Sequence, residues 1–249
     1  MPECIESSFV LRRRSGDVPG VRWSPAVSPA PTASDPPIAL LFHGGSGHKR
    51  HERLLRMGRW LAATAGFTAV AIDGPCHGHR VPAPMAARDY QQLIVDEGVK
   101  RVIARMTGDW LAALAELKAE GRADDANEAD VSVFGMSMGA RFGLPVAAAL
   151  GTRLRCAVFG KFGIWQAEPL HPGLSTPELT LAAARAIDAP VLYHVQWNDA
   201  IFPRDGQFEL FDALGSTDKR LVARSGPHAA THPDDESDWQ EFIAAHGRP

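Results

Sequence analysis

The sequence contains no apolar run of the ~20 residues that a membrane-spanning helix needs. Its first six residues include two acidic side chains and none of the apolar character of a secretion signal. Net charge is also small, because 26 lysines and arginines nearly balance 29 aspartates and glutamates. A chain with a formal net charge of −3 has no electrostatic attraction for nucleic acid or for an anionic membrane. These absences predict a soluble, cytoplasmic protein that binds neither.

Cysteine is scarce, with three residues in 249: Cys4, Cys76 and Cys156. Their separations match no metal-ligand motif, and an odd number cannot pair completely within one chain. Cys156 lies in an apolar run, where a cysteine behaves as a small core residue. The sequence also contains no internal repeat and no low-complexity tract. It therefore predicts neither a disulfide framework nor a repeat protein.

Apolar runs of strand length alternate with helical segments along the chain. Hydrophobic residues make up 45% of the sequence, which suits one large α/β domain over residues 1–249. We expect buried strands at 38–42, 67–72, 131–134, 154–159, 190–197 and 219–223. We expect helices directly after Ser137 and at 50–65, 89–121, 178–187, 204–214 and 235–245, the longest being divided at Gly98 and Gly108. Strands joined through helices form parallel sheets with helices on both faces.

Two further strands are expected before that alternation, at 8–14 and 21–27. A turn-rich segment joins them, so they should pair antiparallel and add an edge to the parallel sheet. Residues 28–37, which contain four prolines, are expected to form an irregular surface loop. The predicted fold is α/β, with a mostly parallel central sheet of about eight strands, an antiparallel N-terminal edge and helices on both faces.

One predicted strand ends in Gly135-Met136-Ser137-Met138-Gly139, and a helical pattern of small residues follows. Gly-x-Ser-x-Gly between a strand and a helix is typical of a nucleophile elbow, in which the serine occupies a sharp and strained turn. The glycines allow neighbouring backbone to approach closely, and the helix behind the serine supplies N–H groups and the positive end of its dipole. The pattern predicts that Ser137 is a nucleophile.

Four other motifs lie at or just after the carboxyl ends of predicted strands, where ligands bind in parallel sheets. They are His43-Gly44-Gly45, Asp73-Gly74-Pro75-Cys76-His77-Gly78, Asn198-Asp199-Ala200-Ile201-Phe202-Pro203 and Gly226-Pro227-His228. Together with the serine turn they resemble the α/β-hydrolase family, and within it the small dienelactone-hydrolase-like and carboxylesterase members. The resemblance extends over nearly the whole chain, from about Ile38 to Ala245. It implies the α/β-hydrolase fold and serine hydrolase chemistry.

In that family the nucleophile is followed along the chain by an acid and then by a histidine. Asp199 comes 62 positions after Ser137, and His228 comes 29 positions after Asp199, just beyond the last predicted strand. The resemblance implies that His228 takes the serine proton, while Asp199 orients the imidazole and stabilises its protonated form. Asp205 is the alternative acid, although it falls inside the next helix, and His232 is the alternative base.

An oxyanion hole needs two fixed N–H donors. The backbone of Met138, at the start of the helix, is expected to provide one. Gly45, in the loop after the first buried parallel strand, is expected to provide the other, with Gly44 and Ser46 as alternatives. We expect His43 to be one of the residues of a substrate pocket and to order this loop rather than to act in catalysis.

Four histidines in and near the two glycine-containing loops are potential metal ligands: His43, His48, His77 and His79. They form no closed ligand set with supporting hydrogen bonds, and the family has a similar Asp-x-x-x-His-Gly turn for structural reasons. We expect no metal and no cofactor. Cys76 lies in the same turn but lacks the elbow of a nucleophile.

The segment in which family members often carry a lid is short here, at about 162–176, which predicts an open site without a large cap domain. Four aromatic residues near strand ends are candidates for the wall of an apolar substrate pocket: Phe162, Trp165, Trp197 and Phe202. Core packing is the alternative for each of them.

The sequence therefore predicts a serine carboxylic-ester hydrolase that forms an acyl-enzyme with a small-molecule ester, as a monomer or small homo-oligomer. A serine peptidase, an amidase or an acyltransferase would use the same triad. A catalytically silent ligand-binding member of the fold is a further alternative. Such members usually have a broken triad, whereas all three positions are occupied by suitable residues here.

Overall fold

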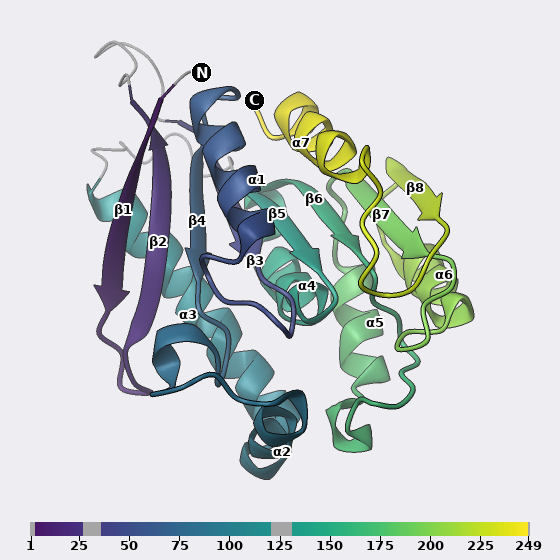
Figure 1. The fold of residues 1–249 in the computed structure, drawn as a ribbon. Coiled ribbons are helices and arrows are strands. Elements are labelled where there is room, and N and C mark those ends of the chain that lie inside the picture. Colours follow the sequence, from purple (N-terminus) through teal and green to yellow (C-terminus); the bar gives the residue numbers. More distant parts are fainter. Residues whose placement is uncertain (1–2, 27–35, 121–130, 249) are drawn as a thin grey trace.

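The computed structural model describes residues 3–26, 36–120 and 131–248. Eight strands in this part of the chain form one sheet in the order β1-β2-β4-β3-β5-β6-β7-β8 (Figure 1). The strands are β1 (Cys4–Leu11), β2 (Val18–Pro25), β3 (Ile38–Phe42), β4 (Thr68–Ile72), β5 (Val131–Met136), β6 (Leu154–Gly160), β7 (Val191–Gln196) and β8 (Lys219–Arg224). Strands β3 to β8 run parallel, whereas β2 pairs antiparallel with both β1 and β4. The predicted α/β-hydrolase fold with an antiparallel N-terminal edge is confirmed.

Helices cover both faces of the sheet (Figure 1). On one face lie α1 (Glu52–Ala63) and α7 (Asp235–His246). The other face is covered by α2 (Ala87–Glu97), α3 (Val99–Glu120), α4 (Met138–Leu150), α5 (Pro177–Arg185) and α6 (Arg204–Ala213). Between β6 and α5 the chain forms one short 3₁₀ helix, Pro172–Leu174, so the described residues contain no large cap.

Each face of the sheet buries its own apolar cluster, because the central strands are apolar on both sides. On the face of α1 and α7, the cluster includes Trp23, Met57 and Trp239. On the opposite face, Trp110 stacks on Phe42 with ring centroids 4.1 Å apart. Burial of a large apolar side chain stabilises the fold by about 1.5–3 kcal/mol. The sheet is thereby fixed from both sides, and with it the edge at which the parallel strands end.

The first hairpin lies earlier in the chain than predicted. Leu11 pairs with Val18, so residues 12–17 form the turn rather than the end of a strand. Within this turn Gly16 adopts a φ of 108°, and its N–H donates to the carbonyl of Arg13. The positive φ of Gly16 belongs to this turn, whereas the strand itself ends earlier, at Leu11.

The helical stretch predicted over 89–121 is divided at Gly98, as expected. Gly98 ends α2 with a φ of 95° and donates its N–H to carbonyl groups of the preceding turn. The second break, expected at Gly108, is wrong, because α3 keeps its helical backbone through that residue. The proline-rich loop expected over 28–37 lies outside the described residues except for positions 36 and 37. None of the described helices is both long and apolar enough to cross a membrane.

Two helical glycines give a matched test of this packing. A Cβ at Gly58 in α1 would lie 2.3 Å from the ring of Trp23, whereas one at Gly108 in α3 would meet only the guanidinium of Arg13 at 3.5 Å. We expect Gly58→Ala to lower the free energy of unfolding by about 1–3 kcal/mol through overpacking. Gly108→Ala should raise it by up to about 1 kcal/mol, because alanine is the better helix former.

Urea denaturation of the two variants beside the wild type measures both changes. Stabilisation by Gly58→Ala would contradict the close contact between α1 and the tryptophan of β2.

Candidate active site

The serine turn is formed by backbone packing that excludes side chains. Ser137 has a φ of 59° and a ψ of −123° between β5 and α4, a conformation that a non-glycine residue rarely adopts. A Cβ at Gly135 would lie 2.4 Å from the carbonyl oxygen of Gly139, and one at Gly139 would lie 2.6 Å from that of Phe42. Both glycines of the Gly-x-Ser-x-Gly motif are therefore required by contact with neighbouring backbone.

Ser137 lies at one end of a hydrogen-bonded chain of three side chains. Its Oγ is 2.9 Å from Nε2 of His228, whose Nδ1 is 2.7 Å from Oδ2 of Asp199. The other oxygen of Asp199 accepts from the backbone N–H groups of Ile201 and Phe202, at 2.8 and 2.9 Å. The carboxylate side chain is fully buried, and its contact assigns the donor hydrogen of the imidazole to Nδ1. Nε2 is then free to accept the serine proton.

The alternative acid and base lie elsewhere. The side chain of Asp205, in the first turn of α6, is 94% exposed. His232 is half exposed and has Nδ1 at 3.5 Å from a carboxylate oxygen of Asp234. The structure therefore brings together Ser137, Asp199 and His228 and leaves both alternatives outside this contact.

Buried polar side chains hold the loop that carries His228. Gln196, the last residue of β7, donates from Nε2 to the carbonyl groups of Ser225 and Gly226, at 3.0 and 2.9 Å. On the other side of the histidine, Nζ of Lys161 donates to the carbonyl of Ala230. Burial lowers the pKa of Lys161 to about 8. Sequence reasoning missed both residues, although each stands at or just after the carboxyl end of a parallel strand.

The predicted oxyanion loop follows β3. Gly45 contacts the pocket beside Ser137 and Met138, and a Cβ on it would lie 2.5 Å from the hydroxyl oxygen of Tyr90. His43 orders the loop, since its Nε2 accepts from the N–H of Gly74 at 2.7 Å. Its Nδ1 then carries the hydrogen and donates to the carbonyl of Gly44 at 2.8 Å. Burial lowers the pKa of His43 to about 3, which keeps the ring neutral.

The turn after β4 is tied to the same loop. Asp73 accepts from the backbone N–H and the Nζ of Lys49, at 2.9 and 2.6 Å, and from the N–H of His79 at 2.8 Å. Burial opposes ionisation of Asp73, but the hydrogen bonds from Lys49 and His79 outweigh it and lower the pKa of the carboxyl. Among the described residues, no group of three histidine, cysteine, aspartate or glutamate side chains is arranged to hold a metal ion.

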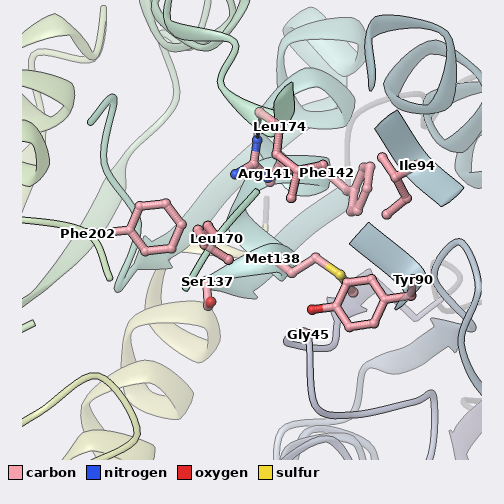
Figure 2. Close-up of a pocket in the computed structure, with 10 residues that line it drawn as sticks. All are labelled: Gly45, Tyr90, Ile94, Ser137, Met138, Arg141, Phe142, Leu170, Leu174 and Phe202. Carbon is pink, nitrogen blue, oxygen red and sulfur yellow. Dashed lines mark hydrogen bonds between the residues drawn. The ribbon is translucent and has the colours of Figure 1, made fainter. Parts of the chain in front are cut away.

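A pocket of about 50 Å³ opens beside Ser137 (Figure 2). Ten residues line it, and most are apolar: Gly45, Tyr90, Ile94, Ser137, Met138, Arg141, Phe142, Leu170, Leu174 and Phe202. Of the five residues that the sequence analysis placed in a substrate pocket, one, Phe202, is among them.

The other four predicted pocket residues lie outside this lining. The ring of Phe162 lies behind that of Phe202, with centroids 4.9 Å apart, and His43 contacts a smaller cavity next to Gly74. Trp165 and Trp197 are half exposed and pack on α6, the first bonded to Glu209 and the second under the guanidinium of Arg204. A position near the end of a strand therefore does not determine whether a side chain points into the pocket.

Arg141, which sequence reasoning also missed, connects the pocket to the segment between β6 and α5. Its guanidinium donates to the carbonyl of Leu174 and, at 2.9 Å, to Oε1 of Gln166, and it lies over the ring of Phe162 at 5.3 Å. Burial lowers the pKa of Arg141 to about 10. The side chain thus holds the segment that contributes Leu170 and Leu174 to the pocket wall.

Comparisons with solved structures find the same fold in known proteins. An esterase from an Arctic intertidal metagenomic library, in complex with polyethylene glycol, is 29% identical, with a TM-score of 0.79 over 98% of this chain and 94% of that one. A Klebsiella pneumoniae protein assigned as a dienelactone hydrolase is 20% identical, with a TM-score of 0.70 over 98% of both chains. Dienelactone hydrolase from Anabaena variabilis is 18% identical, with a TM-score of 0.63 over 98% and 97%. The last two likenesses are of fold alone.

No curated protein matches the chain. Residues 25–236, however, match the dienelactone hydrolase family of hydrolases. This stretch includes β3 to β8, the serine turn and the loops that carry Asp199 and His228. The chain belongs to the dienelactone hydrolase family.

Proposed function

We propose that the protein hydrolyses carboxylic esters through an acyl-enzyme formed on Ser137. The observation that carries the proposal is the unbroken hydrogen-bonded chain from Asp199 through His228 to the serine hydroxyl. A free hydroxyl is a weak nucleophile, and an adjacent oriented base is what activates it. The 29% identity to an esterase over nearly the whole chain supports an ester as the substrate.

In the acylation step, Ser137 Oγ attacks the ester carbonyl carbon while its proton moves to Nε2 of His228. The carbonyl oxygen becomes an oxyanion, which the backbone N–H groups of Met138 and Gly45 stabilise. The imidazolium then gives the proton to the leaving alcohol. In the second step His228 takes a proton from water, and the oxygen of that water attacks the acyl carbonyl. The imidazolium then returns the proton to Ser137 Oγ as the acid leaves.

The pocket supports a short acyl group. Its volume of about 50 Å³ is room for only a few water-sized groups. Phe142, Leu170, Leu174 and Phe202 make its wall apolar, which suits a hydrocarbon chain and not a charged one. Apart from Ser137, the polar side chains in the lining are Tyr90 and Arg141, and the guanidinium is occupied by the contacts to Leu174 and Gln166.

Ser137→Ala should abolish hydrolysis of p-nitrophenyl acetate and labelling by a fluorophosphonate probe, because both need the same hydroxyl. The surface variant Ser237→Ala, in which α7 loses one hydroxyl, should keep wild-type labelling and turnover. Labelling is read by intact-protein mass spectrometry and turnover by nitrophenolate release. Labelled Ser137→Ala protein would show that another residue is the nucleophile.

His228→Ala should reduce kcat/KM by about 10⁴-fold or more, since it removes the base from a group of residues that acts as a unit. His232→Ala, four positions later in the same loop, should stay within about 3-fold of wild type because its half-exposed ring faces Asp234. Steady-state kinetics on p-nitrophenyl acetate separates the two. Similar losses in both variants would refute the choice of His228 as the base.

Leu174→Ala should shift activity toward longer acyl chains by removing part of the pocket wall opposite Ser137. We expect the ratio of kcat/KM for p-nitrophenyl hexanoate over acetate to rise by at least about 10-fold, as methylene-sized changes in apolar pockets do. Leu93→Ala, on the exposed side of α2, is the control and should leave the ratio unchanged. An unchanged ratio in Leu174→Ala would mean that the acyl group lies elsewhere.

A further inference from the structure

We propose that His77 is a positioning residue for the oxyanion hole, acting through a hydrogen bond from its Nε2 to the carbonyl of Gly45. The inference rests on the proposed function and assigns a role to the histidine turn after β4, residues 73–79, which that function leaves unexplained. His77 touches neither Ser137 nor the space beside it, so its effect passes through the backbone of the loop that follows β3.

Both ring nitrogens of His77 face carbonyl oxygens. Nδ1 is 2.6 Å from the oxygen of Pro75, and Nε2 is 2.9 Å from that of Gly45. A carbonyl oxygen can only accept, so the contact with Gly45 needs a hydrogen on Nε2. The ring is buried and lies against Tyr90, with centroids 4.4 Å apart. With both nitrogens engaged in this way, His77 has no nitrogen left to bind a metal.

Holding a carbonyl fixes the N–H on the other side of the same peptide. The peptide group is planar and trans, so its C=O and N–H point in opposite directions. His77 holds the carbonyl of Gly45 and thereby aims the N–H of Ser46. His43 holds the carbonyl of Gly44 and aims the N–H of Gly45 in the same manner. Two histidines thus hold the two peptide groups that flank Gly45, whose N–H is the proposed oxyanion donor.

The turn that carries His77 is itself constrained. Cys76 has a φ of 61° although it is not a glycine, and a Cβ at Gly78 would lie 2.2 Å from the carboxylate carbon of Asp73. Asp73 is in turn held by Lys49, which lies just beyond the oxyanion loop. A rigid turn is needed if His77 is to aim a neighbouring peptide, because an oxyanion hole works through donors that are in place before the reaction.

The test compares two variants, His77→Gln and His77→Met, whose new side chains are similar to each other in length and shape. Glutamine keeps an N–H donor that reaches toward Gly45, and methionine has none. We expect His77→Met to lower kcat by about 10²-fold with KM within about 3-fold, because only the oxyanion is affected. His77→Gln should recover at least about 10-fold of that loss. His77→Phe, which keeps a ring against Tyr90 and lacks a donor, replaces the methionine variant if that variant does not fold.

A second readout uses 1,1,1-trifluorobutan-2-one. Ser137 Oγ adds to its carbonyl, the serine proton passes to His228, and the carbonyl oxygen becomes an oxyanion in the hole. Its inhibition constant should rise in His77→Met by the same factor as kcat falls, and recover in His77→Gln. If the role of His77 were purely structural, the variants would change in thermal stability, and the rise of the inhibition constant would not equal the fall of kcat.

The outcomes separate the two proposals. If the wild type does not bind the ketone, the serine esterase proposal fails and the role of His77 with it. If the wild type binds the ketone but His77→Met retains the wild-type kcat and inhibition constant, the inference about His77 alone is overturned. Equal losses in the methionine and glutamine variants would also overturn it, since the hydrogen bond would then be irrelevant.

Discussion

Close contact between backbone segments around Ser137 is the constraint on which the candidate site depends. Gly139 lies so near the end of β3 that a Cβ would be 2.6 Å from the carbonyl oxygen of Phe42. Strand β3, strand β5 and helix α4 therefore meet at one point without intervening side chains. The strained conformation of Ser137 persists there because the surrounding structure leaves it no alternative. The same contact sets the start of α4 beside the loop that follows β3, so Ser137 and the proposed oxyanion donors are held by the same backbone packing.

Polar groups buried behind that point hold the two loops that flank the serine. On one side, Gln196 and Lys161 bond to carbonyl groups before and after His228. On the other side, His43 and His77 bond to carbonyl groups of the glycine loop. His43 holds the loop in which it lies. The other three side chains each stand at or beyond the end of one strand and hold the backbone that follows another. Buried donors and acceptors that are all satisfied make such loops rigid, and rigid loops are what base and oxyanion catalysis require.

The fold and the serine turn could be predicted from local patterns, and the choice of Asp199 and His228 came from the order of residues in the family that the chain resembles. Apolar runs bounded by glycine loops define parallel strands, and their carboxyl ends must lie along one edge. The hairpin lies earlier than predicted, because its ladder closes at Leu11 and Val18 and leaves residues 12–17 as the turn. The pocket was mostly missed, since Tyr90 and Ile94 come from α2, whose place against the sheet depends on packing. Trp165 and Trp197 stand near strand ends but turn outward to α6.

The pocket wall and the reacting groups are held by different parts of the structure. Ser137 and its partners depend on strand ends and on backbone contacts within the sheet. Leu170 and Leu174 depend on the guanidinium of Arg141, whose hydrogen bonds to Leu174 and Gln166 hold a segment without regular strands. A change in that segment would alter the shape of the pocket beside Ser137 and leave the serine turn unchanged. The pocket wall and the serine turn can therefore change separately, although α4 follows directly on Ser137 and carries Arg141 one turn later.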